Sequence, residues 1–166
     1  MIRHFSRLTA FCLFFAFAVS VFAQDLPSVT VRDLSGKPVR TGSFISEGKP
    51  FVVSFFATWC KPCLRELDAV TEVYDEWQEE TGVTFYAVSI DEGSDVKKVK
   101  PLMRAHEWPF VVLSDANGDF KRAMNVAMVP SLFVFDGKGK LLHRTTGYVD
   151  GGEREIIRIL RAQKGK

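Results

Sequence analysis

Two cysteines three residues apart, Cys60 and Cys63, are the side chains most able to do chemistry in this chain. A thiolate attacks disulfides and binds soft metals, and a Cys-x-x-Cys pair serves both purposes in proteins. A purely structural disulfide between them would close a very small loop, which stabilises little by the chain-entropy argument. The pair therefore predicts reactive chemistry, with thiol–disulfide exchange and metal binding as the classes to separate.

The cysteines stand where a strand is expected to become a helix. The apolar, β-prone run 51–57 predicts a strand buried on both faces. Beyond it, apolar residues recur at helical spacing while charged residues fill the other positions. Pro62 falls in the first helical turn, where its missing N–H costs nothing. Free N–H groups and the positive end of the helix dipole would therefore face Cys60, and both stabilise a thiolate. The apolar helix positions are Leu67, Val70, Tyr74 and Trp77.

The first 23 residues have the pattern of a secretory signal peptide. Arg3 and Arg7 precede the apolar run 8–22, and residues 21–23 suit cleavage before Gln24. An uncleaved membrane anchor is the alternative, although the run is shorter than the roughly 20 residues that a span needs. We therefore expect a leader over 1–23 and one exported domain over 24–166.

The hydrophobic fraction, the charge balance and the number of cysteines limit the classes of function that this chain can have. Of the 166 residues, 46% are hydrophobic, which suits one domain with a real core. The leader holds two of the 22 basic residues and none of the 20 acidic ones, so the mature chain is close to neutral. No nucleic-acid partner is expected from such a balance. Without Cys12 the exported protein keeps only Cys60 and Cys63, and a lone vicinal pair favours redox chemistry over a structural staple.

The remaining pattern predicts a mixed sheet. A short hairpin is expected over 29–39, and buried strands over 83–90 and 110–113 alternate with helices. A second hairpin over 131–146 and a closing helix over 152–162 complete the chain. Strand–helix alternation followed by a hairpin and a helix predicts a sheet covered by helices on both faces.

The residues 59–63, Trp-Cys-Lys-Pro-Cys, together with Val129–Pro130–Ser131, resemble the two active-site segments of the thioredoxin superfamily. The chain is similar to its periplasmic branch, the TlpA/ResA-like thiol–disulfide oxidoreductases, over about residues 29–160. The similarity includes Asp33-Leu-x-Gly36, the Ala57-Thr entry and Asp115-Ala-Asn-Gly118. It implies an α/β thioredoxin-like fold, a central mixed β-sheet flanked by helices on both faces, with an N-terminal β-hairpin extension. It also implies no cofactor beyond the Cys60–Cys63 disulfide.

This resemblance implies a role for each matching position. Cys60 would be the exposed nucleophile that forms a mixed disulfide with the substrate, and Cys63 would be the resolving thiol. Pro130 would be cis, and the backbone of Val129 would pair with a substrate strand. Trp59 would shield the sulfurs, with an ordinary core aromatic as the alternative. The expected substrate-binding residues are Trp59, Lys61, Pro62 and Val129.

The residues offer two interpretations of the acids that could deprotonate Cys63. Cytoplasmic thioredoxins carry a buried Asp six residues before the first cysteine, and Ser54 stands there in this chain. In the ResA-like branch a glutamate after the next strand lies near the cysteines, and Glu92 matches it. Such a base needs a partly desolvated site. The alternative is that Asp91, Glu92 and Asp95 are solvated loop acids that favour the following helix N-terminus.

The direction of electron flow is expected to be reductive. Pro62 removes one N–H that could stabilise the reduced thiolate, no histidine stands between the cysteines, and the charge of Lys61 is on a long arm. We therefore expect a monomeric protein-disulfide reductase of the periplasm. The resemblance implies a membrane electron-transfer donor, disulfide-containing exported proteins as substrates, and apocytochrome c as one family substrate in cytochrome c maturation.

Three other functions compete with this prediction. A disulfide-forming oxidase or isomerase uses the same fold and pair, but the Lys-Pro dipeptide and the lack of an inserted helical domain between 83 and 129 disfavour it. A peroxidase would need Pro-x-x-x-Thr-x-x-Cys, whereas Thr58 is only two residues before Cys60. A copper or zinc chaperone would need His106 or His143, and both suit ordinary positions in a helix end and a strand. We therefore expect no metal site.

Overall fold

The central strand of the protein is β3 (Gly48–Phe56), in a computed structural model that describes residues 25–46 and 48–163. The last seven residues of β3 are all buried. It pairs in parallel with β4 (Thr84–Ser89) on one side and antiparallel with β6 (Ser131–Gly137) on the other. A strand with neighbours on both edges and helices over its faces reads as a continuous apolar run, because neither of its faces meets water.

The sheet has seven strands in the order β2-β1-β5-β4-β3-β6-β7. Only the pairs β3–β4 and β4–β5 are parallel, so the sheet is mixed as predicted. The N-terminal hairpin of β1 and β2 joins the sheet through an antiparallel pairing of β1 with β5. The remaining strands are β1 (Thr30–Asp33), β2 (Pro38–Arg40), β5 (Val111–Ser114) and β7 (Leu141–Thr146).

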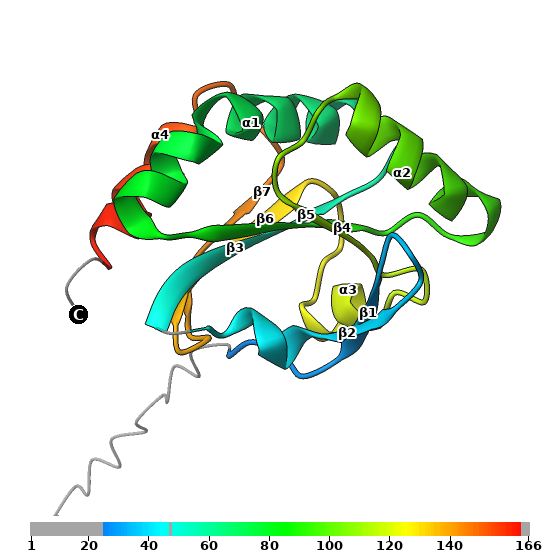
Figure 1. Ribbon diagram of the computed structural model, residues 1–166, viewed down its shortest axis with the longest axis horizontal. Helices are drawn as coiled ribbons and strands as arrows, with labels where there is room; N and C mark the ends of the chain where they lie inside the picture. Colours follow the sequence, from blue (N-terminus) through cyan, green and yellow to red (C-terminus); the bar gives the residue numbers. More distant parts are fainter. Residues whose placement is uncertain (1–24, 47, 164–166) are drawn as a thin grey trace, which may run out of the picture.

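Helices cover both faces of this sheet (Figure 1). Three of them, α1, α2 and α4, lie on one face, whereas α3 lies on the opposite face. The β1–β2 hairpin extends one edge of the sheet. This arrangement confirms the expected α/β fold class with its N-terminal hairpin. The helices are α1 (Lys61–Thr81), α2 (Val96–Ala105), α3 (Asp119–Ala123) and α4 (Glu153–Arg161), with short 3-10 turns η1 (Thr41–Phe44) and η2 (Gly93–Asp95).

The helix after the cysteines begins and ends where its capping residues predict. Cys60 is the N-cap of α1 and Pro62 lies in its first turn. Gly82 ends the helix in a left-handed conformation with φ of 68°, which a residue with a side chain adopts only at a cost. The backbone N–H of Gly82 donates a hydrogen bond of 2.8 Å to Gln78. Cys60 and Pro62 therefore set the start of α1 just after the end of β3, and Gly82 sets its end.

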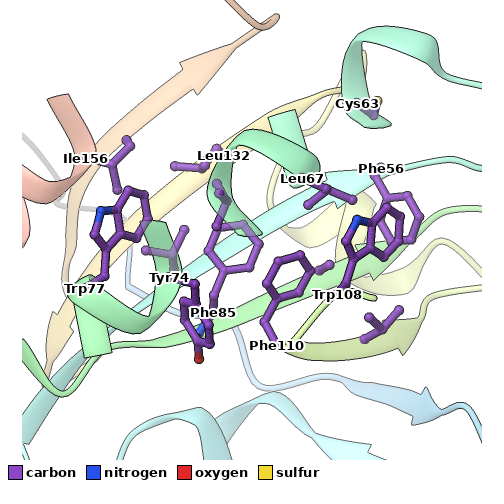
Figure 2. Packing of buried hydrophobic residues seen from close by; sticks show 14 of the residues in the cluster. Phe56, Cys63, Leu67, Tyr74, Trp77, Phe85, Trp108, Phe110, Leu132 and Ile156 are labelled. Atoms are coloured by element: carbon purple, nitrogen blue, oxygen red, sulfur yellow. The ribbon is translucent and has the colours of Figure 1, made fainter. Parts of the chain in front are cut away.

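A layer of apolar side chains joins α1 to the sheet (Figure 2). The buried side of α1 carries Cys63, Leu67, Tyr74 and Trp77, and these face aromatic residues that come from β3, β4 and the segment before β5. Trp108 meets Phe56, the last residue of β3, edge to face with ring centroids 5.4 Å apart. The cysteine end of α1 is therefore seated on a rigid apolar layer.

The predicted signal peptide over 1–23 and its alternative as an anchor lie outside the described residues. Within the residues that the structure describes, no helix is both long enough and apolar enough to cross a membrane.

Candidate active site

The two cysteines lie at the junction of β3 and α1 and are joined by a disulfide bond, with their Cα atoms 5.3 Å apart. The chain leaves β3 through a turn in which the N–H of Cys60 donates to the carbonyl of Ala57 at 3.0 Å. The Sγ of Cys60 then accepts a hydrogen bond from the N–H of Cys63 at 3.3 Å. A backbone N–H in the first turn of α1 therefore points at Cys60, as a thiolate at this position requires.

The two sulfurs differ little in burial in this disulfide form. Cys63 is fully buried, and Cys60 is only 5% exposed. The sequence suggested an openly exposed nucleophile, so the structure corrects that expectation. The reason is that Cys60 is tied to Cys63 on one side and packs against the Val129 loop on the other.

Trp59 is 66% exposed immediately before Cys60, so the core-aromatic alternative for this residue is wrong. Lys61 is also exposed, and Pro62 is half-buried. The side chains on both sides of Cys60 along the chain are therefore open to solvent, although Cys60 itself is covered.

A second segment, from Met128 to Ser131, lies against the disulfide. The peptide bond between Val129 and Pro130 is cis. The carbonyl oxygen of Val129 lies 3.8 Å from the Sγ of Cys60. The hydroxyl of Ser131 donates to the carbonyl of Met128 at 2.8 Å, which closes the loop on itself. Pro130 is buried, whereas Val129 is half-buried and Met128 is 60% exposed.

A buried carboxyl lies one helical turn beyond Cys63. Glu66 is 6% exposed on the sheet-facing side of α1, and the hydroxyl of Ser54 on β3 donates to its Oε1 at 2.6 Å. Burial raises the pKa of Glu66 from 4.5 to about 7, and the hydrogen bond from Ser54 opposes this only in part. Positions three apart on a helix share a face, so Glu66 and Cys63 are neighbours on α1. The site thus contains a carboxyl that can take up a proton near neutral pH.

Glu66 is the functional candidate that sequence reasoning missed. A signal was present, because Glu66 lies three residues after Cys63 and four before Val70, inside the apolar stripe of the predicted helix. A glutamate on that stripe must be buried when the helix packs. Its pairing with Ser54 could not be seen from the sequence, since the two residues meet only when α1 folds back over β3.

The structure places the three loop acids differently from one another. Glu92 is exposed at the start of η2, so it lacks the desolvation that a base for Cys63 needs. Asp95 is half-buried and pairs with Lys98 at 2.8 Å. Asp91 is only 1% exposed and accepts hydrogen bonds from Thr58, so its description as a solvated acid is wrong. The geometry favours Glu66 over Glu92 as the base.

A hollow of about 260 Å³ opens beside Glu66. Its walls come from α1, from β6 and the end of β7, and from the loop that leads into α4 together with the start of α4. The loop is tied to the Pro130 segment, because the N–H of Gly147 donates to the carbonyl of Pro130 at 2.8 Å. The residues lining the hollow include Glu66, Leu132, Tyr148, Val149 and Glu153.

The two histidines that a metal chaperone would need, His106 and His143, lie in different surroundings. Nδ1 of His106 lies 2.8 Å from Oδ1 of Asp68, beside the indole of Trp108. His143 lies on β7 opposite Val134 of β6, with its Nε2 buried and unpartnered. Within the described ranges, no three His, Cys, Asp or Glu side chains lie close enough together to hold a metal ion.

Comparison with known proteins places the chain in a family. Residues 22–144 match the AhpC/TSA family. The thiol-disulfide oxidoreductase ResA of Bacillus thuringiensis subsp. konkukian (strain 97-27) is 32% identical over 124 residues, which cover 75% of this chain and 69% of the relative. The thioredoxin-like protein YneN of Bacillus subtilis (strain 168) is 27% identical over 132 residues, covering 80% and 75%.

Two solved structures illustrate the similarity of fold. The solution structure of an uncharacterized thioredoxin-like protein from Porphyromonas gingivalis superposes with a TM-score of 0.75 at 53% identity, covering 87% of this chain and 95% of the other. The crystal structure of StoA from Bacillus subtilis superposes with a TM-score of 0.64 at 17% identity, covering 81% and 98%. At that identity the second match concerns the fold alone.

Proposed function

The chain belongs to the AhpC/TSA family and is a thiol–disulfide oxidoreductase of the ResA type, and from this premise we propose that it reduces disulfide bonds in exported proteins. In the proposed reaction Cys60 attacks the substrate disulfide, Cys63 releases the product, and Glu66 accepts the proton of Cys63. The proposal excludes any bound cofactor, since the reaction needs only the two sulfurs.

One observation carries this proposal. A disulfide at the N-terminus of α1 faces the Val129 carbonyl on one side and has the buried carboxyl of Glu66 one turn further along the helix. The helix end favours a thiolate on Cys60, and Glu66 supplies a base near neutral pH. These are the two groups that a mixed-disulfide mechanism needs.

The electrons balance over two steps. The Cys60 thiolate attacks one sulfur of the substrate disulfide, a Cys60–substrate bond forms, and the other substrate sulfur leaves as a thiolate that takes a proton from water. Cys63 then gives its proton to Glu66 and attacks Cys60. The second substrate sulfur leaves as a thiolate. The substrate disulfide has then gained two electrons, and the Cys60–Cys63 pair has lost two and become a disulfide.

The substrate approaches the exposed side of this site. The backbone of Val129 is half-buried beside Cys60, which suits pairing with an extended substrate strand. Trp59, Lys61 and Pro62 border the same sulfur along the chain. We assign these four residues to substrate binding, because each is at least partly open to solvent beside Cys60, as the encounter with a protein disulfide needs.

The leader pattern over 1–23 supports export to the periplasm or retention at the membrane. A reductase in an oxidising compartment needs a continuous electron supply, so a membrane electron-transfer protein is the proposed donor. Apocytochrome c with an oxidised cysteine pair is the specific substrate that the resemblance suggests. Competition between such a peptide and an unrelated disulfide peptide tests this assignment, since equal kcat/KM values would remove it.

The reduction potential of the Cys60–Cys63 pair tests the direction of the reaction. The pair is equilibrated against a series of glutathione ratios and its oxidised fraction is measured. We expect a value near that of thioredoxin, about −270 mV. A value near −120 mV, the oxidant end of the scale, would mean that the protein forms disulfides instead. That result would make the oxidase alternative the function.

A further inference from the structure

We propose that Asp91 is a positioning residue for Cys60: its buried carboxylate holds the turn Ala57–Cys60 in the shape that presents the reactive sulfur. The inference rests on the proposed function, in which Cys60 makes the first attack. Asp91 follows β4, whereas Cys60 follows β3, and the two strands are parallel neighbours in the sheet. Their ends therefore meet at the same edge.

Both carboxylate oxygens of Asp91 are occupied by donors. The N–H of Thr58 donates to Oδ2 at 2.9 Å and lies 3.2 Å from Oδ1. The hydroxyl of Thr58 donates to Oδ1 at 2.7 Å, and the hydroxyl of Ser89 donates to Oδ2 at 2.7 Å. Burying a carboxylate is unfavourable unless donors replace its water shell. Two hydroxyls and one backbone N–H meet that requirement here, so the carboxylate of Asp91 is held in a fixed position by the residues around it.

The contacts reach Cys60 through a short turn. Thr58 is its second residue, and the N–H of Cys60 closes it on the carbonyl of Ala57 at 3.0 Å. Just before the turn, the N–H of Ile90 donates to the carbonyl of Phe56 at 2.9 Å. The end of β4 therefore holds the chain on both sides of Ala57. The direction in which the backbone enters Trp59 and Cys60 is fixed by these bonds.

The side chains of Ala57 and Trp59 add little to that constraint. Ala57 contributes one methyl group, and Trp59 is 66% exposed. In the disulfide form the bond to Cys63 also holds Cys60. Reduction removes this bond, so the turn, together with the contacts of Cys60 to the Val129 loop and to the N–H of Cys63, then holds the free thiolate. The contribution of Asp91 should therefore be larger for the reactivity of reduced Cys60 than for the stability of the oxidised protein.

The test measures the attack of Cys60 alone, with Cys63→Ala as the parent protein. Reduced protein is mixed with dithiobis-nitrobenzoic acid, and release of the nitrobenzoate thiolate gives the rate at which Cys60 forms a mixed disulfide. We expect Asp91→Ala to lower this rate about 10-fold or more, because displacement of a reacting group by about 1 Å can cost up to about 100-fold. Asp91→Asn keeps one acceptor for Thr58 and should lie between Asp91→Ala and the parent.

Asp115 provides a matched control. It is 2% exposed and accepts hydrogen bonds from the N–H groups of Phe120 and Lys121 at 3.1 and 2.7 Å. Asp115→Ala therefore removes an equally buried carboxyl that stabilises α3 and does not touch the turn. We expect its rate to stay within about twofold of the parent. An equal slowing by Asp115→Ala and Asp91→Ala would mean general loosening of the fold and would overturn the proposal.

A double-mutant cycle with Thr58→Val locates the effect. This change removes the hydroxyl donor and keeps the N–H, so it should slow the parent several-fold and add nothing in the Asp91→Ala background. Should Asp91→Ala fail to fold, the rates of Asp91→Asn and Thr58→Val still test whether Asp91 positions Cys60. Parent-like rates in these variants, or effects that multiply independently, would contradict the inference. A reduction potential near −120 mV would reverse the proposed function but leave this ranking of rates intact.

Discussion

The hydroxyl of Ser54 on β3 donates a 2.6 Å hydrogen bond to the carboxyl of Glu66 on α1, and both side chains are buried. Ser54 stands six residues before Cys60, where cytoplasmic thioredoxins carry an aspartate. In this chain the strand supplies a hydroxyl there and the helix supplies the carboxyl. The helix side of this helix–sheet contact therefore carries a buried carboxyl, Glu66, one turn beyond Cys63.

The buried carboxyl of Glu66 predicts a specific pH dependence of stability. Burial raises the pKa of Glu66 to about 7 in the folded protein, whereas the unfolded value is 4.5. The folded state therefore binds more protons between these values, and stability falls as the pH rises from about 4.5 to about 7. A shift of this size corresponds to a few kcal/mol, at about 1.4 kcal/mol per unit. Glu66→Gln should lose this slope.

Urea unfolding of the disulfide form at pH 4.5 and at pH 8 measures the effect. The wild-type protein should lose stability relative to Glu66→Gln at the higher pH, because only the wild type must then hold a buried charge. A difference between the two proteins that is the same at both pH values would contradict the assignment.

The resolving step should depend on Glu66 and not on Glu92. With a small thiol attached to Cys60 as a mixed disulfide, release of that thiol reports the attack by Cys63. Its rate should rise with pH through about 7, since burial sets the pKa of Glu66 there and the ionised form accepts the proton. Glu66→Gln should lose this rise and slow the step about 100-fold, the lower end of general-base effects.

Glu92→Gln is the control for this experiment, because Glu92 is an exposed glutamate on the segment that follows β4. Its rate and pH profile should match the wild type. A flattened profile in Glu92→Gln with an unchanged one in Glu66→Gln would return the role of base to Glu92.

The sequence could predict the cysteine pair and its setting because these are local patterns. The buried strand before Cys60, Pro62 in the first turn and Gly82 at the helix end each carry their own structural preference. The hydrogen-bond partners of Glu66 and the burial of Asp91 could not be predicted in this way. Each is a charged residue whose environment is made by donors from a different element, Ser54 for one and Thr58 for the other.

The fold depends on a close approach of two backbones that the sequence pattern did not reveal. Gly137 at the end of β6 pairs with Gly48 at the start of β3. A Cβ on Gly137 would lie 1.9 Å from the carbonyl carbon of Gly48, which is backbone and cannot swing away. Gly137→Ala should therefore lower the free energy of unfolding by at least about 1–3 kcal/mol, as overpacking does.

Gly42→Ala is the control, because a Cβ there meets no atom within 4 Å. Its stability should stay within about 0.5 kcal/mol of the wild type in the same urea titration. Equal stabilities of the two variants would show that β3 and β6 can separate at this pair without cost.

The proposed division of labour between the cysteines predicts which variant traps a substrate. Cys63→Ala should retain the attack by Cys60 but lose the release step, so disulfide-linked adducts accumulate on Cys60. Cys60→Ser should give no adducts and abolish turnover. Non-reducing electrophoresis followed by mass spectrometry of the linked peptides measures both. Adducts on Cys63 in the Cys60→Ser protein, or turnover by that protein, would reverse the two roles.

The exposed indole of Trp59 predicts a split between substrate binding and chemistry. Because the indole is 66% exposed, its removal costs little core packing. The free energy of unfolding of Trp59→Ala should therefore lie within about 0.5 kcal/mol of the wild-type value. An aromatic side chain beside the reactive sulfur can bury a large apolar area against a protein substrate. KM for a protein disulfide should rise several-fold, while the rate with dithiobis-nitrobenzoic acid stays unchanged. Should both rates fall together, Trp59 would act on the sulfur itself, as a shield, and its substrate-binding role would be wrong.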